Sequence, residues 1–200
     1  MNVLELNILE TSEDFFTVEI GTSKLTFKES DKPCFYHFAI NIPGNQFSII
    51  KHRIAERIPL NRDRGLDEIY FSSFDADSMY FEDPAGNVVE LIGRRKRDLF
   101  GDPSFAEAFL NISEVGVVTP HLEEVSDELQ DIGLPLRGAV LDADSVNFLG
   151  KDEAFFVLVR PGRKWYFSDS ISEVFPLTAT LETDYTVQIN EEGIANIEKA

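Results

Sequence analysis

Polar and apolar residues alternate along the first thirty positions of the chain. The alternation covers residues 3–9, 15–20 and 24–28, and Gly21 and Thr22 separate the second stretch from the third. A two-residue period is typical of strands that bury one face. We therefore expect residues 1–32 to form a set of N-terminal strands without a helix.

The pattern changes at residues 33–93, where one helical period stands among strand-like stretches. Residues 35–42 are apolar and rich in aromatic and branched side chains, and Pro43-Gly44-Asn45 interrupts them. Over residues 46–58 the apolar positions recur at steps of three and four, which predicts a helix with one buried side. Further strands are expected at 67–74, 78–82 and 88–92. The order strand, helix, strand, strand, strand defines one βαβββ module.

A second helical period follows a basic, Phe-rich connector at 93–111, in which a short helix is expected near 103–109. Residues 112–119 indicate a strand and residues 121–132 a helix that ends at Gly133. A third module over 112–189 is completed by strands expected at 134–137, 145–149, 154–160, 164–167 and 177–182. The polar tail 190–200 is expected to fray or to form a short helix. Two helices among many strands favour the α+β class, with curved mixed sheets.

Composition narrows the classes of partner. The formal net charge is −18, and so acidic a protein repels the phosphate backbone of nucleic acids. The one basic run, residues 94–97, is interpreted as a solvated loop or a contact for an anion. The single cysteine, Cys34, cannot form an internal disulfide, and no apolar run is long enough to cross a membrane. With no recognisable signal peptide, we expect a cytoplasmic protein without nucleic-acid or membrane partners.

Two ionisable side chains stand inside apolar strands. Glu90 shares a strand face with Val88 and Ile92, and burying its carboxylate there is unfavourable unless it is paired or bound to a metal. His37 shares a face with Phe35 and Ala39. A lone histidine in such a strand is more often a hydrogen-bonded core residue than a metal ligand, so both interpretations stay open on this evidence.

Two segments resemble the vicinal oxygen chelate superfamily, which includes glyoxalases and extradiol dioxygenases. Residues 79–92, Met-Tyr-Phe-Glu-Asp-Pro-Ala-Gly-Asn-Val-Val-Glu-Leu-Ile, are similar to the segment that ends a module in that superfamily. Residues 36–43, Tyr-His-Phe-Ala-Ile-Asn-Ile-Pro, resemble the strand that opens one. The resemblance implies a fold of βαβββ modules around a metal pocket, with Glu90 and His37 as metal ligands.

Residues 112–120 resemble a second module opening, but Glu114 stands where the superfamily has its other histidine. The implied ligand set is His37, Glu90 and Glu114, which resembles the site of toxoflavin lyase; a solvent-facing Glu114 is the alternative. Because the strands of 1–32 lack their own first strand and helix, the first module is incomplete or permuted. Residues 112–132 would then fill the open position, unless a second subunit fills it in a homodimer.

A site of one histidine and two carboxylates favours a hard divalent ion, Mn²⁺ or Fe²⁺. We therefore expect a metal-dependent enzyme that acts on a small oxygenated, cyclic or aromatic molecule, by lyase or ring-cleaving dioxygenase chemistry. Strand position adds Phe35, Asn41, Tyr70 and Trp165 as pocket candidates. The alternative is a metal-free binding protein of the bleomycin-resistance type, in which some of the 17 Phe residues line an apolar groove.

Overall fold

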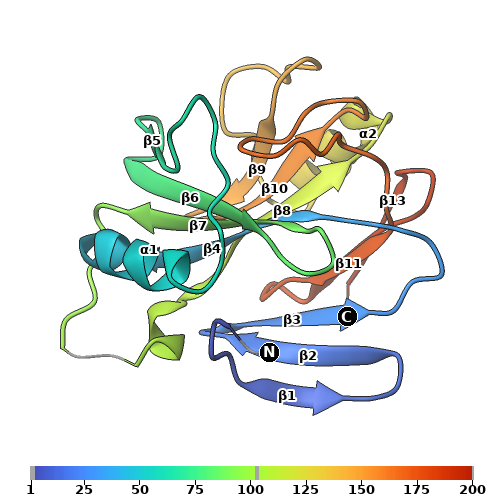
Figure 1. Cartoon of the computed structure of the whole chain (residues 1–200). Coiled ribbons are helices and arrows are strands. Elements are labelled where there is room, and N and C mark those ends of the chain that lie inside the picture. The colour runs from blue at the N-terminus through green and yellow to red at the C-terminus, as the bar shows by residue number, and fades with distance from the viewer. Residues whose placement is uncertain (1–2, 102–103, 200) are drawn as a thin grey trace. The chain divides into compact units, whose positions relative to one another are not determined.

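The computed structural model describes residues 3–101 and 104–199 of the chain. The chain divides into two compact units, Met1–Ser113 and Glu114–Ala200, and each is described by itself. Figure 1 labels most of the helices and strands of both units. Within the described residues, none of the helices is long and apolar enough to cross a membrane.

The first unit opens with a three-stranded antiparallel sheet in the order β1-β2-β3. Its strands are β1 (Ile8–Thr11), β2 (Phe15–Ile20) and β3 (Ser23–Lys28). The first strand starts later than the alternation predicted, because Glu5 has a φ of 58° and this left-handed conformation interrupts the extended backbone. The preceding Leu4 and Leu6 still pack against the core of the unit, so their apolar character reflects burial rather than strand.

The module expected over residues 33–93 is present in the predicted order. Its elements are β4 (His37–Pro43), the 3₁₀ turn η1 (Gly44–Gln46), α1 (Phe47–Ala55), β5 (Ile69–Phe71), β6 (Ala76–Glu82) and β7 (Val88–Arg94). These strands lie in the order β5-β6-β7-β4, with β4 parallel to β7 and the other pairs antiparallel. Strand β7 continues two residues past its predicted end and so includes Arg94.

Side-chain alternation gives this sheet two chemically different faces. One face, which we call the helix face, packs against α1 (Figure 1). Its buried members are Phe38, Ile40, Ile42, Met79, Phe81, Val89 and Leu91. The opposite face, which we call the site face, carries the residues at the intervening positions. They include His37, Ala39, Asn41, Ala76, Ser78, Tyr80, Val88, Glu90, Ile92 and Arg94.

The connector of the first unit contains the short 3₁₀ turn η2 (Ala106–Ala108) where a helix over 103–109 was expected; residues 102 and 103 lie outside the described part. Strand β8 (Asn111–Val118) begins in the first unit and continues into the second. The second unit also contains α2 (Leu122–Asp131), β9 (Asn147–Lys151), β10 (Ala154–Val159), β11 (Leu177–Thr180), β12 (Tyr185–Ile189) and β13 (Ala195–Lys199). Strand β10 pairs with β8 in parallel and with β9 antiparallel, and β11-β12-β13 form an antiparallel sheet.

Two strands predicted in the second unit are absent. In 134–137 only an isolated bridge joins Leu136 to Leu149, and Pro135 has no N–H to donate to a ladder. In 164–167 the backbone turns instead, and Phe167 has a left-handed φ of 52°. The tail expected over 190–200 as a frayed end or short helix contains β13 instead, which pairs with β12 after a turn at Asn190–Gly193.

Candidate metal centre

The site face brings one histidine and one glutamate together on neighbouring parallel strands. In the register between β4 and β7, His37 lies opposite Val88 and Ala39 lies opposite Glu90. Both ionisable residues are buried, with exposed fractions of 6% for His37 and 3% for Glu90. Two groups that water solvates well are thus held inside the protein, where they need a partner.

The turn before β7 is held by the side chains of Asp83 and Asn87. Asp83 Oδ1 accepts hydrogen bonds from the N–H groups of Ala85 and Asn87, both at 2.9 Å. Asn87 donates from Nδ2 to Asp83 Oδ2 at 2.7 Å and accepts from the N–H of Tyr36 at 2.8 Å. The turn therefore joins the start of β7 to the start of β4, which fixes the relative position of the strands that carry Glu90 and His37.

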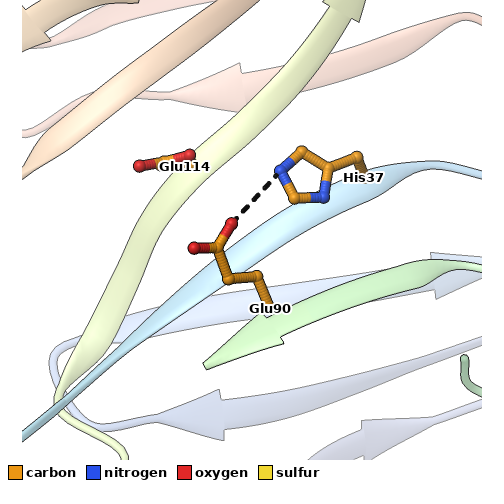
Figure 2. A group of neighbouring side chains, drawn as sticks. All are labelled: His37, Glu90 and Glu114. Atoms are coloured by element: carbon orange, nitrogen blue, oxygen red, sulfur yellow. Dashed lines mark ion pairs between the residues drawn. The ribbon is translucent and has the colours of Figure 1, made fainter. Parts of the chain in front are cut away.

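The imidazole of His37 is oriented by the backbone of β7. Its Nδ1 lies 3.1 Å from the carbonyl oxygen of Val88, and a carbonyl only accepts, so Nδ1 carries the proton in this hydrogen bond. In neutral His37, Nε2 is then the unprotonated ring nitrogen and carries the lone pair. Nε2 faces Glu90 at 3.7 Å from Oε2 (Figure 2). The atom directed at the carboxylate is the one that can bind a metal ion.

Burial raises the pKa of Glu90 to about 7. The hydroxyls of Ser78 and Tyr80 and the positive charge of Arg94 favour the ionised form and offset part of this rise. The carboxylate is therefore poised between its protonated and ionised forms near neutral pH. A cation beside it would shift that balance towards the ionised form.

Glu114 is the first residue of the second unit and is joined directly to Ser113, the last residue of the first. Ser113 is fixed by Arg94, whose Nη2 donates to Ser113 Oγ at 2.9 Å. Glu114 is buried, with 4% of its surface exposed, and does not face solvent. One possible ligand atom from each of His37, Glu90 and Glu114 lies within 4.8 Å of the other two (Figure 2).

The donor set fits one divalent ion. Three ligand atoms that each lie about 2.0–2.3 Å from one ion are about 2.8–4.0 Å apart. His37 Nε2 and Glu90 Oε2, at 3.7 Å, have such a spacing, and the three ligand atoms all lie within 4.8 Å of one another. One imidazole nitrogen and two carboxylates give a hard, oxygen-rich site. A second sign is the hydroxyl of Ser78, which is buried on the same face and has no hydrogen-bond partner among the described residues.

Asn41 and Arg94 form a second polar group on the site face. Arg94 is buried, its Nε donates to Asn41 Oδ1 at 3.2 Å, and its guanidinium lies 5.2 Å from the ring centre of Phe74. The basic run at residues 94–97 was interpreted as a solvated loop or an anion contact. Arg94 is buried, so the interpretation as a solvated loop is wrong for this residue. Arg94 follows residues 88, 90 and 92 at the next alternate position of the strand, so a longer predicted strand would have placed Arg94 on the site face.

The other pocket candidates lie in different surroundings. Tyr70 pairs with Asp77 across β5 and β6, which puts it on the helix face, where its hydroxyl donates to Asp75 at 2.8 Å. Tyr70 is therefore not a residue of the site face. Phe35 is partly buried in the segment before β4. Trp165 is buried within the second unit, in a turn rather than in the predicted strand.

Comparisons with known proteins agree with this architecture. A family profile described as toxoflavin-degrading enzyme matches residues 112–163, the stretch that begins with β8 and contains Glu114. A crystal structure of a proposed dioxygenase from Bacillus subtilis has 13% identity and a TM-score of 0.61, over 96% of this chain and 76% of that one. A variant of glyoxalase I from Zea mays has 16% identity and a TM-score of 0.51, over 96% of this chain and 83% of that one.

No curated protein matches the sequence. At these identities the structural likeness establishes the fold, and it confirms the α+β architecture expected from the sequence. The match at 112–163 begins at the segment, residues 112–120, that resembles a module opening.

Proposed function

Because this chain has the fold of the vicinal oxygen chelate superfamily, we propose that it is a metal-dependent enzyme that acts on a small oxygenated, cyclic or aromatic molecule. The observation that carries the proposal is the buried group of His37, Glu90 and Glu114, with ligand atoms within 4.8 Å of one another. Burying these residues without a cation is unfavourable, and a divalent ion would compensate both carboxylates at once.

His37, Glu90 and Glu114 would hold the ion. When bound, a divalent ion of this kind supplies a Lewis acid for a pair of substrate oxygens or a redox centre for dioxygen. The residues of this chain prepare the site for it. The carbonyl of Val88 keeps the proton of His37 on Nδ1, which leaves Nε2 as the donor atom. Burial keeps water away from Glu90, which strengthens its attraction to any cation.

Manganese or iron is the proposed metal, because two carboxylates and one imidazole form a harder donor set than the thiolate-rich sites of structural zinc. Three protein ligands leave coordination positions for a substrate that offers two neighbouring oxygens. The profile that covers residues 112–163 is named for toxoflavin degradation, which supports a ring compound as substrate. Toxoflavin itself is therefore the first compound to test.

The metal-free binding protein is the competing function. Such a protein would have to hold two buried carboxylates and one imidazole close together without an ion. It would also give no reason for the buried Ser78 hydroxyl, which has no hydrogen-bond partner among the described residues. Burying carboxylates so close together is unfavourable even where hydrogen bonds offset part of the cost of removing them from water. No comparable arrangement of acids is needed to line an apolar groove, so the geometry favours the metal-dependent function.

The test begins with protein stripped by a chelator and then reconstituted with Mn²⁺, or with Fe²⁺ under nitrogen. We expect one ion per chain by elemental analysis and a higher melting temperature than that of the stripped protein. Glu90→Gln should lose the ion, whereas Glu123→Gln, at an exposed position on α2, should retain it. A wild-type protein that binds neither ion after reconstitution would contradict the proposal.

Substrate turnover forms the second stage. Loss of toxoflavin absorbance in the presence of the reconstituted protein, together with an oxygen electrode, separates the two proposed reaction types. Oxygen uptake equal to substrate loss would assign a dioxygenase, and loss of substrate under nitrogen would assign a lyase. Glu90→Gln is the matched inactive control, because glutamine has nearly the same shape as glutamate without the charge.

A further inference from the structure

Ser78 is a buried serine one strand away from Glu90. On β6 it lies opposite Ile92, while Tyr80 lies opposite Glu90, so Ser78 and Glu90 are diagonal neighbours on the site face. The Ser78 residue has no exposed surface. Among the buried side-chain nitrogen and oxygen atoms of the described residues, the Ser78 hydroxyl oxygen is the single one without a hydrogen-bond partner.

Such a hydroxyl is unusual because buried polar groups are nearly always hydrogen-bonded, and leaving one unsatisfied is destabilising. The cross-strand neighbours of Ser78 are Ile69 on β5 and Ile92 on β7, whose side chains offer no acceptor. The carboxylate of Glu90 is a nearby acceptor on the same face. The hydroxyl lies close enough to lower the pKa of that carboxylate, yet its geometry falls short of a hydrogen bond.

We propose that Ser78 is a positioning residue of the metal site, whose hydroxyl donates to the oxygen of Glu90 that does not hold the ion. The inference rests on the proposed function, since it assigns Ser78 a role only when Glu90 is a ligand. A carboxylate that ligates through one oxygen keeps acceptor capacity on the other. A donor at that second oxygen orients the ligand and favours its ionised form, as outer partners of metal ligands do elsewhere.

This role predicts opposite effects on metal affinity and on the stability of the stripped protein. Removing a hydroxyl that has no partner should leave the melting temperature of the stripped protein unchanged or raise it. Removing the partner of a metal ligand should weaken ion binding by about 10- to 100-fold. A serine with an ordinary structural role would show the reverse: a lower melting temperature and an unchanged affinity.

The experiment titrates Mn²⁺ into stripped wild type, Ser78→Ala and Ser126→Ala by isothermal calorimetry, with melting temperatures measured before and after loading. Ser126 is the matched control because it is equally buried, lies on α2 and has a satisfied hydroxyl, which accepts from Gln130 Nε2 at 3.2 Å. Ser126→Ala should lower the melting temperature and keep wild-type affinity. Ser78→Cys retains the volume with a weaker donor and should give an intermediate affinity.

Two results would overturn the inference while leaving the proposed function intact. One is wild-type Mn²⁺ affinity in Ser78→Ala. The other is a fall in the melting temperature of stripped Ser78→Ala as large as that of Ser126→Ala, which would show that the hydroxyl is already satisfied without the ion. Failure of the wild type itself to bind Mn²⁺ is a different outcome, and it would overturn the proposed function and this inference with it.

Discussion

The side-chain oxygen of Asn87 accepts a hydrogen bond from the backbone N–H of Tyr36, at 2.8 Å and across 51 residues of sequence. Tyr36 directly precedes His37, and Asn87 stands three residues before Glu90. This one contact therefore couples the turn of residues 83–87 to the two candidate metal ligands of the first unit, His37 and Glu90. The turn is part of the site's construction as well as a chain reversal.

Asn87→Ala should destabilise the protein by about 1–3 kcal/mol, because it leaves a backbone N–H and an aspartate oxygen without their partner. Metal affinity should fall as well, since β4 and β7 lose a contact that aligns them. Urea unfolding and Mn²⁺ titration measure the two effects. Asn196→Ala, at an exposed position on β13, should stay within about 0.5 kcal/mol of the wild type. Equal stability of the two variants would contradict this view of the turn.

Glu90→Gln should stabilise the metal-free protein at pH 8 and have a smaller effect at pH 5. The folded pKa of Glu90 is raised from 4.5 to about 7, so the folded state disfavours its ionised form. The resulting loss of stability is absent below the unfolded pKa and grows as pH rises from about 4.5 to 7. A shift of this size corresponds to about 3 kcal/mol. Denaturant unfolding at both pH values measures it, and a gain at pH 8 no larger than that at pH 5 would argue against a buried, uncompensated carboxylate.

Metal binding should strengthen with pH until about pH 7 and then level off. The ion requires ionised Glu90, so below its pKa each bound ion must release a proton. Calorimetry at pH 6 in two buffers of different ionisation enthalpy counts that proton directly. An apparent affinity that stays constant between pH 5.5 and pH 7.5 would exclude Glu90 as a titrating ligand.

Gly44 and Gly86 should respond differently to alanine. A Cβ on Gly44 would lie 2.2 Å from the carbonyl oxygen of Arg94, a backbone clash that neither segment can relieve without moving β7. A Cβ on Gly86 would meet nothing within 4 Å, but its φ of +85° is left-handed. We expect about 1 kcal/mol of destabilisation for Gly86→Ala and well above 3 kcal/mol for Gly44→Ala. Thermal unfolding ranks the two, and the reverse order would be inconsistent with this packing.

The module at 33–93 could be predicted from sequence because its local signals agree with its tertiary structure. The break at Pro43-Gly44 and the turn at residues 83–87 mark the ends of β4 and the start of β7, and alternation places His37 and Glu90 on one face. That all three predicted ligands lie close together agrees with the resemblance from which Glu114 was inferred. Their role as metal ligands stays a prediction.

Other features were beyond local reasoning. The alternation at residues 3–9 is disrupted by the left-handed Glu5, and no residue type there announces that conformation. The C-terminal strand β13 is short and polar, and it forms because β12 offers an edge with which it can pair. Ser78 gave no signal at all, since a serine is recognised as unsatisfied only after every neighbouring acceptor has been placed.

The orientation of His37 depends on a main-chain atom, the carbonyl oxygen of Val88. Every amino acid supplies that oxygen, so exchanging Val88 for isoleucine or leucine cannot delete the acceptor. A mutational scan, which measures the effect of changing side chains, would therefore identify residue 88 only as a buried core position. Substitutions at position 88 therefore preserve the tautomer of His37 as long as the backbone keeps its path. A change that moved the carbonyl oxygen of residue 88 would remove this constraint.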